Sequence, residues 1–138
     1  MTKYITFSDK ETKLLAAKLA GKTKFGVIAL FGELGAGKTT FVQGFAEGLK
    51  IKEKIISPTF VLIRQHPISK TKKILYHIDL YRLNNMTDLK QLGLEEIWSD
   101  PKNIVLIEWA DKIKNLLPKG VIKIYLEVVD TNTRKIMI

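Results

Sequence analysis

The stretch Gly32-Glu-Leu-Gly-Ala-Gly-Lys-Thr39 limits the possible folds of this 138-residue chain more than any other part of its sequence. It matches the pattern G-x-x-x-x-G-K-[ST] at every fixed position. The apolar run Phe25–Phe31 directly before it is typical of a strand buried on both faces. After it, Phe41, Val42 and Phe45 share one face of an expected helix. A buried strand, a glycine-rich loop and a helix in this order predict a phosphate-binding loop in an α/β fold.

The residue types of this loop suit a nucleoside triphosphate bound with magnesium. Glycines let backbone N–H groups turn inward around phosphate oxygens without a clash of Cβ atoms. The N-terminus of the following helix adds positive partial charge. We expect Lys38 to contact the β- and γ-phosphates of ATP and the Thr39 hydroxyl to ligate Mg²⁺. The loop residues predicted to bind the nucleotide are Gly32, Gly35, Ala36, Gly37, Lys38, Thr39 and Thr40.

Two carboxylates stand at the ends of predicted strands. Asp79 follows the apolar run Ile74–Ile78, and Glu108 follows Ile104–Ile107. Because ligands of open α/β sheets bind outside the carboxyl ends of the strands, both acids should lie beside the phosphate loop. Together with Lys38 they are the predicted catalytic residues, and both are candidate magnesium ligands. One could hold a metal-bound water while the other orients the attacking water, and the sequence leaves the assignment open. The alternative for each is a solvated strand end or a helix cap.

The segment Ser57-Pro-Thr-Phe60 precedes another predicted strand. A threonine in a loop that closes over the γ-phosphate can add a hydroxyl ligand to Mg²⁺, which makes Thr59 a candidate metal ligand and switch residue. The alternative is an ordinary turn in which proline fixes φ.

Other conspicuous side chains have structural roles in the simplest interpretation. Trp109 continues a strand past its acidic residue, so it should alternate to the opposite face and pack in the core. His66 and His77 have no partner at metal-ligand spacing in the sequence. Tyr76 and Tyr81 are expected to pack on the sheet.

The whole chain, residues 1–138, is predicted to form a single domain, a P-loop NTPase-like three-layer α/β sandwich with a mixed parallel and antiparallel sheet. Ser8 and Glu11 form a capping box, in which the Glu11 carboxylate should reach the Ser8 amide, and the helix should end at Gly21. Further helices are expected at 87–98, with a break at Gly93, and at 110–117. Further strands are expected at 60–66 and 74–78, as a hairpin, and at 103–109, 121–129 and 133–138, with the last two paired.

The charge balance and the start of the chain indicate which kinds of partner and which cellular location to expect. The net charge is +9, from 23 Lys and Arg against 14 Asp and Glu, which favours polyanionic partners without naming one. The lysines are scattered, apart from a cluster at Lys70–Lys73 in an expected hairpin turn. With no cysteine, no secretory signal and no apolar run long enough to span a bilayer, the expected location is the cytoplasm, with no membrane partner.

Other phosphate-loop proteins fit less well. Asn85-Met-Thr-Asp88 lacks the lysine of a guanine-reading motif, and Asp79-Leu-Tyr-Arg82 lacks the glycine of a GTPase switch. A small-molecule phosphotransferase stays open as an alternative, although the chain has few arginines for a lid and little length for an acceptor site. A third possibility is a nucleic-acid-binding module that uses the positive surface, with nucleotide as a structural ligand.

The order of the motifs resembles the TsaE family, bacterial ATPases of tRNA threonylcarbamoyladenosine biosynthesis. The resemblance covers essentially the whole chain and rests on five segments: Gly32–Thr40, Ser57–Phe60, Tyr76–Leu83, Ile107–Ala110 and Leu116–Pro118. It implies slow ATP hydrolysis with Mg²⁺ and assembly with a TsaB–TsaD heterodimer. In that complex TsaD transfers the threonylcarbamoyl group to tRNA, so the chain would meet tRNA indirectly.

The same resemblance adds residue roles that the residues alone do not supply. It implies that Trp109 lies near the nucleotide and that Thr59 is a switch residue. It also implies that Thr12 in the N-terminal segment and the late Arg134 lie near the base. Glu33 stands where the family often has Asp, a change that the loop tolerates.

Overall fold

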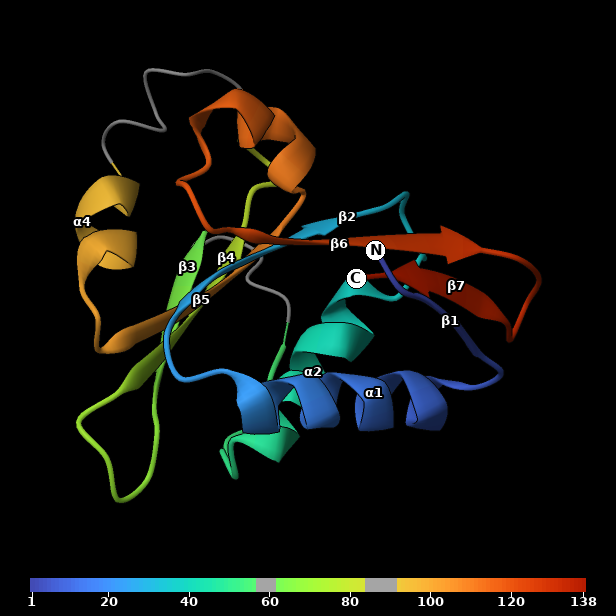
Figure 1. Ribbon diagram of the computed structural model, residues 1–138, viewed down its shortest axis with the longest axis horizontal. Helices are drawn as coiled ribbons and strands as arrows, with labels where there is room; N and C mark the ends of the chain where they lie inside the picture. The colour runs from blue at the N-terminus through green and yellow to red at the C-terminus, as the bar shows by residue number, and fades with distance from the viewer. Residues whose placement is uncertain (57–61, 84–91) are drawn as a thin grey trace.

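The computed structural model describes residues 1–56, 62–83 and 92–138, and within them seven strands form one mixed sheet (Figure 1). The strands are β1 (Lys3–Thr6), β2 (Gly26–Phe31), β3 (Ile63–Pro67), β4 (Ile74–Asp79), β5 (Asn103–Glu108), β6 (Ile122–Val128) and β7 (Arg134–Met137). The helices in this part of the chain are α1 (Asp9–Lys22), α2 (Lys38–Gly48), α4 (Leu94–Ser99) and the 3₁₀ helix η1 (Ala110–Leu116). The predicted α/β fold with a mixed sheet is confirmed.

The strand order is β1-β7-β6-β2-β5-β4-β3. Strands β6, β2, β5 and β4 run parallel, which places their carboxyl ends along one edge of the sheet. The other strands pair antiparallel, β7 with β6, β1 with β7 and β3 with β4. These pairings confirm the predicted β3–β4 hairpin and the predicted pairing of the last two strands.

Apolar side chains pack on both faces of the sheet. On one face, Leu106 of β5 belongs to a buried cluster with Phe45 of α2. On the other face, Ile107 belongs to a second cluster with Leu94 of α4 and Ile113 of η1. Figure 1 accordingly shows α1 and α2 on one side of the sheet and α4 and η1 (orange) on the other. This burial holds the central strands, and therefore their carboxyl ends, in fixed positions.

Helix α1 begins where the sequence predicts, with one change in its cap. The Ser8 hydroxyl accepts a hydrogen bond from the Glu11 N–H at 3.1 Å. The Glu11 carboxylate accepts from the Phe7 N–H at 3.2 Å, so the expected bond to the Ser8 amide is wrong by one residue. The helix ends at Lys22 rather than at Gly21.

Several predicted boundaries differ from the structure by one or two residues. The fifth strand ends at Glu108, because Trp109 has a left-handed backbone with φ of 59°. The segment after it is a 3₁₀ helix with a kink at Ile113. The expected break at Gly93 is confirmed, since Gly93 has φ of 67° and α4 begins at Leu94, but the helix continues to Ser99 instead of ending at Trp98. Residues 60–61 and 87–91 of two predicted elements lie outside the described residues.

Candidate nucleotide-binding site

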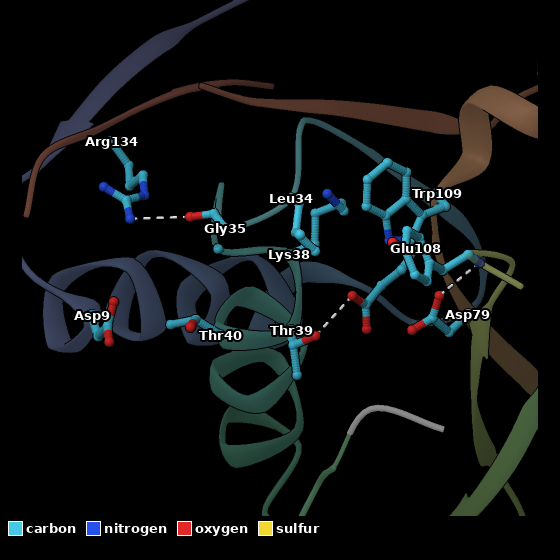
Figure 2. Close-up of a pocket in the computed structure, with 12 residues that line it drawn as sticks. Asp9, Leu34, Gly35, Lys38, Thr39, Thr40, Asp79, Glu108, Trp109 and Arg134 are labelled. Carbon is cyan, nitrogen blue, oxygen red and sulfur yellow. Dashed lines mark hydrogen bonds between the residues drawn. The ribbon is translucent and has the colours of Figure 1, made fainter. Parts of the chain in front are cut away.

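A cavity of about 370 Å³ opens at the carboxyl ends of β2, β4 and β5 (Figure 2). The first turns of α1 and α2 and the start of β7 complete its wall. The lining residues are Asp9, Leu34, Gly35, Gly37, Lys38, Thr39, Thr40, Asp79, Tyr81, Glu108, Trp109 and Arg134. Topology places the cavity there, since three neighbouring parallel strands end at the same edge.

The loop between β2 and α2 has a backbone that requires glycine at two positions. Gly37 caps helix α2 in a left-handed conformation with φ of 99°, which a residue with Cβ rarely adopts. A Cβ on Gly32 would lie 2.5 Å from the Leu126 carbonyl oxygen of β6. The Ala36 N–H donates to the Glu33 carbonyl at 3.0 Å and closes the turn. Since the first N–H groups of a helix have no acceptor within it, this loop presents donors to an anion.

The ammonium group of Lys38 folds back over the loop. It donates to the Gly32 carbonyl at 2.5 Å and to the Glu33 carbonyl at 2.8 Å. It also lies 3.9 Å from the centre of the Trp109 ring, a cation–π contact. Burial lowers the pKa of Lys38 from its ordinary 10.5, and nearby carboxylates, Glu108 foremost, oppose that shift. The positive charge therefore sits at the phosphate loop, held by neutral partners.

Thr39 and Glu108 meet below the loop. The Thr39 hydroxyl donates to Glu108 Oε1 at 2.8 Å, although the two residues are 69 positions apart in the sequence. The other oxygen, Oε2, lies 2.5 Å from Nε2 of the buried His77. His77, expected to be an isolated structural histidine, is thus in contact with an acid of the site.

Asp79 lies directly beside Glu108, since the two are paired residues of the parallel strands β4 and β5. Both carboxylates are buried. Asp79 Oδ1 accepts from the Tyr81 N–H at 3.0 Å. Two neighbouring carboxylates in a buried position repel each other unless a cation compensates. Lys38 supplies one positive charge near the pair, and neighbouring carboxylates at such a place suit a divalent cation.

Two aromatic residues, Trp109 and Tyr81, line the cavity. Trp109 packs against the core cluster on the face opposite Glu108, as alternation predicts, and its left-handed backbone also brings the indole over Lys38. Tyr81 was expected to pack on the sheet. Its side chain is 50% exposed and contacts Trp109, with 5.0 Å between ring centres. Tyr76 is partly buried against the core cluster of α4 and η1, as expected.

The cavity has two chemically different ends. Figure 2 shows Glu108, Asp79 and Trp109 at one end and Arg134 and Asp9 at the other. Arg134 donates from Nη2 to the Gly35 carbonyl at 3.1 Å and from Nη1 to the Asp130 carbonyl at 2.8 Å, so it ties the β6–β7 turn to the loop. The cavity therefore has two carboxylates with a lysine and an indole at one end, and an arginine with one carboxylate at the other.

The structure brings together most of the predicted site residues, with some exceptions. Gly35, Gly37, Lys38, Thr39, Thr40, Asp79, Glu108, Trp109 and Arg134 line the cavity. Ala36 is buried in the loop, and Gly32 lies behind it against β6. Thr12 does not reach the cavity lining, since it is buried with its hydroxyl 2.7 Å from that of Thr6. Thr59 lies outside the described residues.

Three residues of the site were missed by the sequence argument. Asp9 was treated as part of a helix start, although the first residue of α1 lies in the cavity wall. Tyr81 follows Asp79 by two residues, beyond the end of β4, where alternation no longer applies. His77 precedes Asp79 by two residues, and that period-two spacing places both on one face of the strand, a signal that was available.

The residues of the cavity fit a magnesium ion whose other ligands would be phosphate oxygens and water. Among the described residues, no group of three or more His, Cys, Asp or Glu side chains is arranged to hold a metal. Magnesium bound at a phosphate loop takes most of its ligands from phosphate oxygens and water and one or two from the protein. The hydroxyl of Thr39, held by Glu108, is suited to this role.

In the described part of the chain, every helix is too short or too polar to cross a bilayer.

Comparison with known proteins gives one consistent family. A family model described as threonylcarbamoyl adenosine biosynthesis protein TsaE matches residues 6–136. A Bacillus subtilis (strain 168) protein named tRNA threonylcarbamoyladenosine biosynthesis protein TsaE is 38% identical over 135 residues, which cover 97% of this chain and 82% of the relative. A Nostoc protein of the same name is 41% identical over 140 residues, covering 98% and 83%. A crystal structure of Bacillus subtilis YdiB matches with a TM-score of 0.80 and 35% identity, over 98% of this chain and 82% of that one.

Proposed function

Because the chain belongs to the TsaE family, we propose that it serves tRNA threonylcarbamoyladenosine biosynthesis by binding and hydrolysing ATP with Mg²⁺. The biosynthetic role comes from the names of its relatives. The nucleotide chemistry comes from the site itself, whose residues correspond to a phosphate loop with its lysine, its hydroxyl ligand and two acids at strand ends.

One observation carries this proposal most directly, the hydrogen bond between the Thr39 hydroxyl and Glu108 Oε1 at 2.8 Å. It joins the last residue of the phosphate-loop pattern to the acid at the end of a neighbouring strand. The hydroxyl donates its hydrogen to the carboxylate, so the lone pairs of its oxygen are directed elsewhere and can ligate a cation. A packing role alone would not need a hydroxyl facing an acid at this position.

The residues have distinct roles in the proposed reaction. The loop N–H groups and Lys38 hold the triphosphate and offset the charge that develops on it during transfer. Mg²⁺, when bound, neutralises phosphate charge and aligns the γ-phosphate. Thr39 and Glu108 position the cation, and Asp79 or Glu108 orients a water for attack on the γ-phosphorus. The water oxygen bonds to the γ-phosphorus as the bond from that phosphorus to the β–γ bridging oxygen breaks. The water's proton passes to solvent, and ADP and inorganic phosphate leave. Arg134, Asp9 and Thr40 surround the remaining part of the nucleotide.

The two core clusters support the fold class that we propose. Helices on both faces of a sheet with a parallel centre support a P-loop NTPase-like three-layer sandwich. We treat residues 1–138 as a single ATPase domain, supported by a sheet that contains strands from both ends of the chain. The proposed partner is a TsaB–TsaD heterodimer, which the family resemblance implies, with tRNA met through that complex.

Two substitutions test the nucleotide chemistry. Lys38→Ala should weaken ATP binding roughly 10–100-fold, since a hydrogen bond to a charged group is worth about 1.5–3 kcal/mol. At saturating Mg²⁺, Glu108→Gln should leave ATP affinity largely intact but slow phosphate release roughly 100-fold. Lys72→Ala, in the exposed β3–β4 turn, is the matched control for removing a lysine charge. Calorimetry gives the affinities and a phosphate assay gives the rates, alone and with TsaB–TsaD. Unchanged affinity of Lys38→Ala would overturn the proposal.

A further inference from the structure

His77 lies in the middle of β4 with its side chain fully buried. Its strand partner on β5 is Leu106, and Glu108 lies two residues further along. Residues two apart in a strand point to the same face, so His77 and Asp79 share the face that carries Leu75, as Glu108 shares that of Leu106. Both leucines pack in the core cluster of α2. The imidazole therefore lies beneath Glu108, on the side where Thr39 begins helix α2.

The direction of the hydrogen bond between the two side chains follows from their chemistry. A carboxylate can only accept, so Nε2 of His77 carries the hydrogen and donates to Glu108 Oε2 at 2.5 Å. The other ring nitrogen, Nδ1, is buried without a hydrogen-bond partner among the described residues. An unpaired buried polar atom lowers stability relative to an apolar side chain of similar size. Packing alone would favour leucine at this position.

Each oxygen of Glu108 thus has one donor. Thr39 donates to Oε1 and His77 donates to Oε2, so the carboxylate cannot turn without losing one of the two bonds. The fixed carboxylate in turn fixes the hydrogen of the Thr39 hydroxyl. Groups that orient metal ligands in this way control metal affinity in many sites.

We infer that His77 is a positioning residue, which orients Glu108 and through it the Thr39 hydroxyl for the divalent cation at the phosphate loop. This inference rests on the proposed function for its cation. It assigns to a residue outside the cavity lining the task of keeping Thr39 and Glu108 in the arrangement that the cation requires.

A matched pair of variants tests the inference. His77→Leu fills the space without a donor, and His77→Gln retains an N–H near the Nε2 position. The measurement is ATP affinity as a function of Mg²⁺ concentration, with affinity in EDTA as the reference. His77→Leu should raise the Mg²⁺ concentration for half-maximal effect about 10–100-fold. Affinity in EDTA should stay as in the unchanged protein, and His77→Gln should recover most of the loss.

His66→Leu is the control for replacing a buried histidine, since His66 lies on β3 and outside the cavity lining. It should leave the Mg²⁺ dependence unchanged. A purely structural role for His77 predicts that the leucine and glutamine variants behave alike, or that leucine is better. Either result would overturn the inference.

Two further measurements keep the inference testable if a variant folds poorly. In a Glu108→Gln background, His77→Leu should add little to the change in Mg²⁺ dependence, because both act through one carboxylate. In the unsubstituted protein, nitrogen NMR of the histidine rings should show the hydrogen of His77 on Nε2. Additive effects, or a hydrogen on Nδ1 with Nε2 bare, would contradict the inference. If the unsubstituted protein binds no ATP, the proposed function fails, whereas the ring assignment from NMR stands or falls by itself.

Discussion

The ammonium group of Lys38 is held by two carbonyl oxygens and an indole face, and this environment predicts how nucleotide affinity depends on pH. Burial lowers the pKa of Lys38 below 10.5 in the free protein. Bound phosphates favour the charged form and raise the pKa in the complex. Affinity should therefore be constant below the lowered pKa and fall above it, by up to about tenfold per pH unit, as one proton is taken up on binding.

The measurement is ATP affinity across alkaline pH, well above the phosphate pKa of about 6. Calorimetry in two buffers with different ionisation enthalpies should show proton uptake in the same window. Lys38→Met should bind more weakly and lose the pH dependence in that window. A pH profile that persists in this variant would assign the effect to another group.

At the residue scale, the sequence predicted most of the residues that gather at the cavity, but fewer of their contacts. Lys38, Thr39, Asp79 and Glu108 were found because a fixed motif and strand ends specify them. Alternation predicts the core contact of Trp109 but not its contact with Lys38, because it cannot anticipate a positive φ at a tryptophan. The pairing of His77 with Glu108 depends on the register of two strands far apart in the chain, which local spacing does not give.

Helices α1 and α2 approach each other at two glycines of α2. A Cβ on Gly44 would lie 2.4 Å from backbone atoms of Lys13, and one on Gly48 would lie 2.6 Å from the Ala17 carbonyl oxygen. At such distances the two helices must separate to admit even a methyl group. Because α2 carries Lys38 and Thr39 in its first turn, this contact between the helices also helps to fix the position of the phosphate loop relative to the sheet.

Gly44→Ala should therefore lower the free energy of unfolding by about 1–3 kcal/mol, even though alanine is the better helix former. Gly21→Ala in α1 is the matched control, since a Cβ there meets nothing within 4 Å. It should be neutral or stabilising by up to about 1 kcal/mol. Urea unfolding of both variants checks this, and equal effects would show that the close contact does not limit the packing.

Element type was largely predictable and element ends were not. The strand of the phosphate loop, both long helices and the β3–β4 hairpin follow from apolar periodicity and caps. Strand β1 was missed, because four residues carry too little alternation to identify it. Its pairing with β7 comes from contacts between the two ends of the chain, which a local pattern cannot express.

The complete cavity predicts a response of the whole molecule to ligand. A ligand that binds the folded chain alone stabilises it by about 2.7 kcal/mol at one hundred times its dissociation constant. ATP with Mg²⁺ should therefore raise the Tm by several degrees. The rise should shrink when EDTA replaces Mg²⁺ and fall to about half or less in Lys38→Ala at the same ATP concentration, as measured by calorimetric melting. An equal rise with and without the metal would exclude a cation from the bound complex.

The strand order has a consequence for how the chain is made. The central strand β2 pairs with β5 on one side and β6 on the other, and both follow it by a long stretch of sequence. The ribosome therefore synthesises the apolar strand β2 before either of the strands that pair with it. During that interval its open edges can pair with other nascent chains. We therefore expect nascent chains to be most prone to aggregation before β5 and β6 have been synthesised.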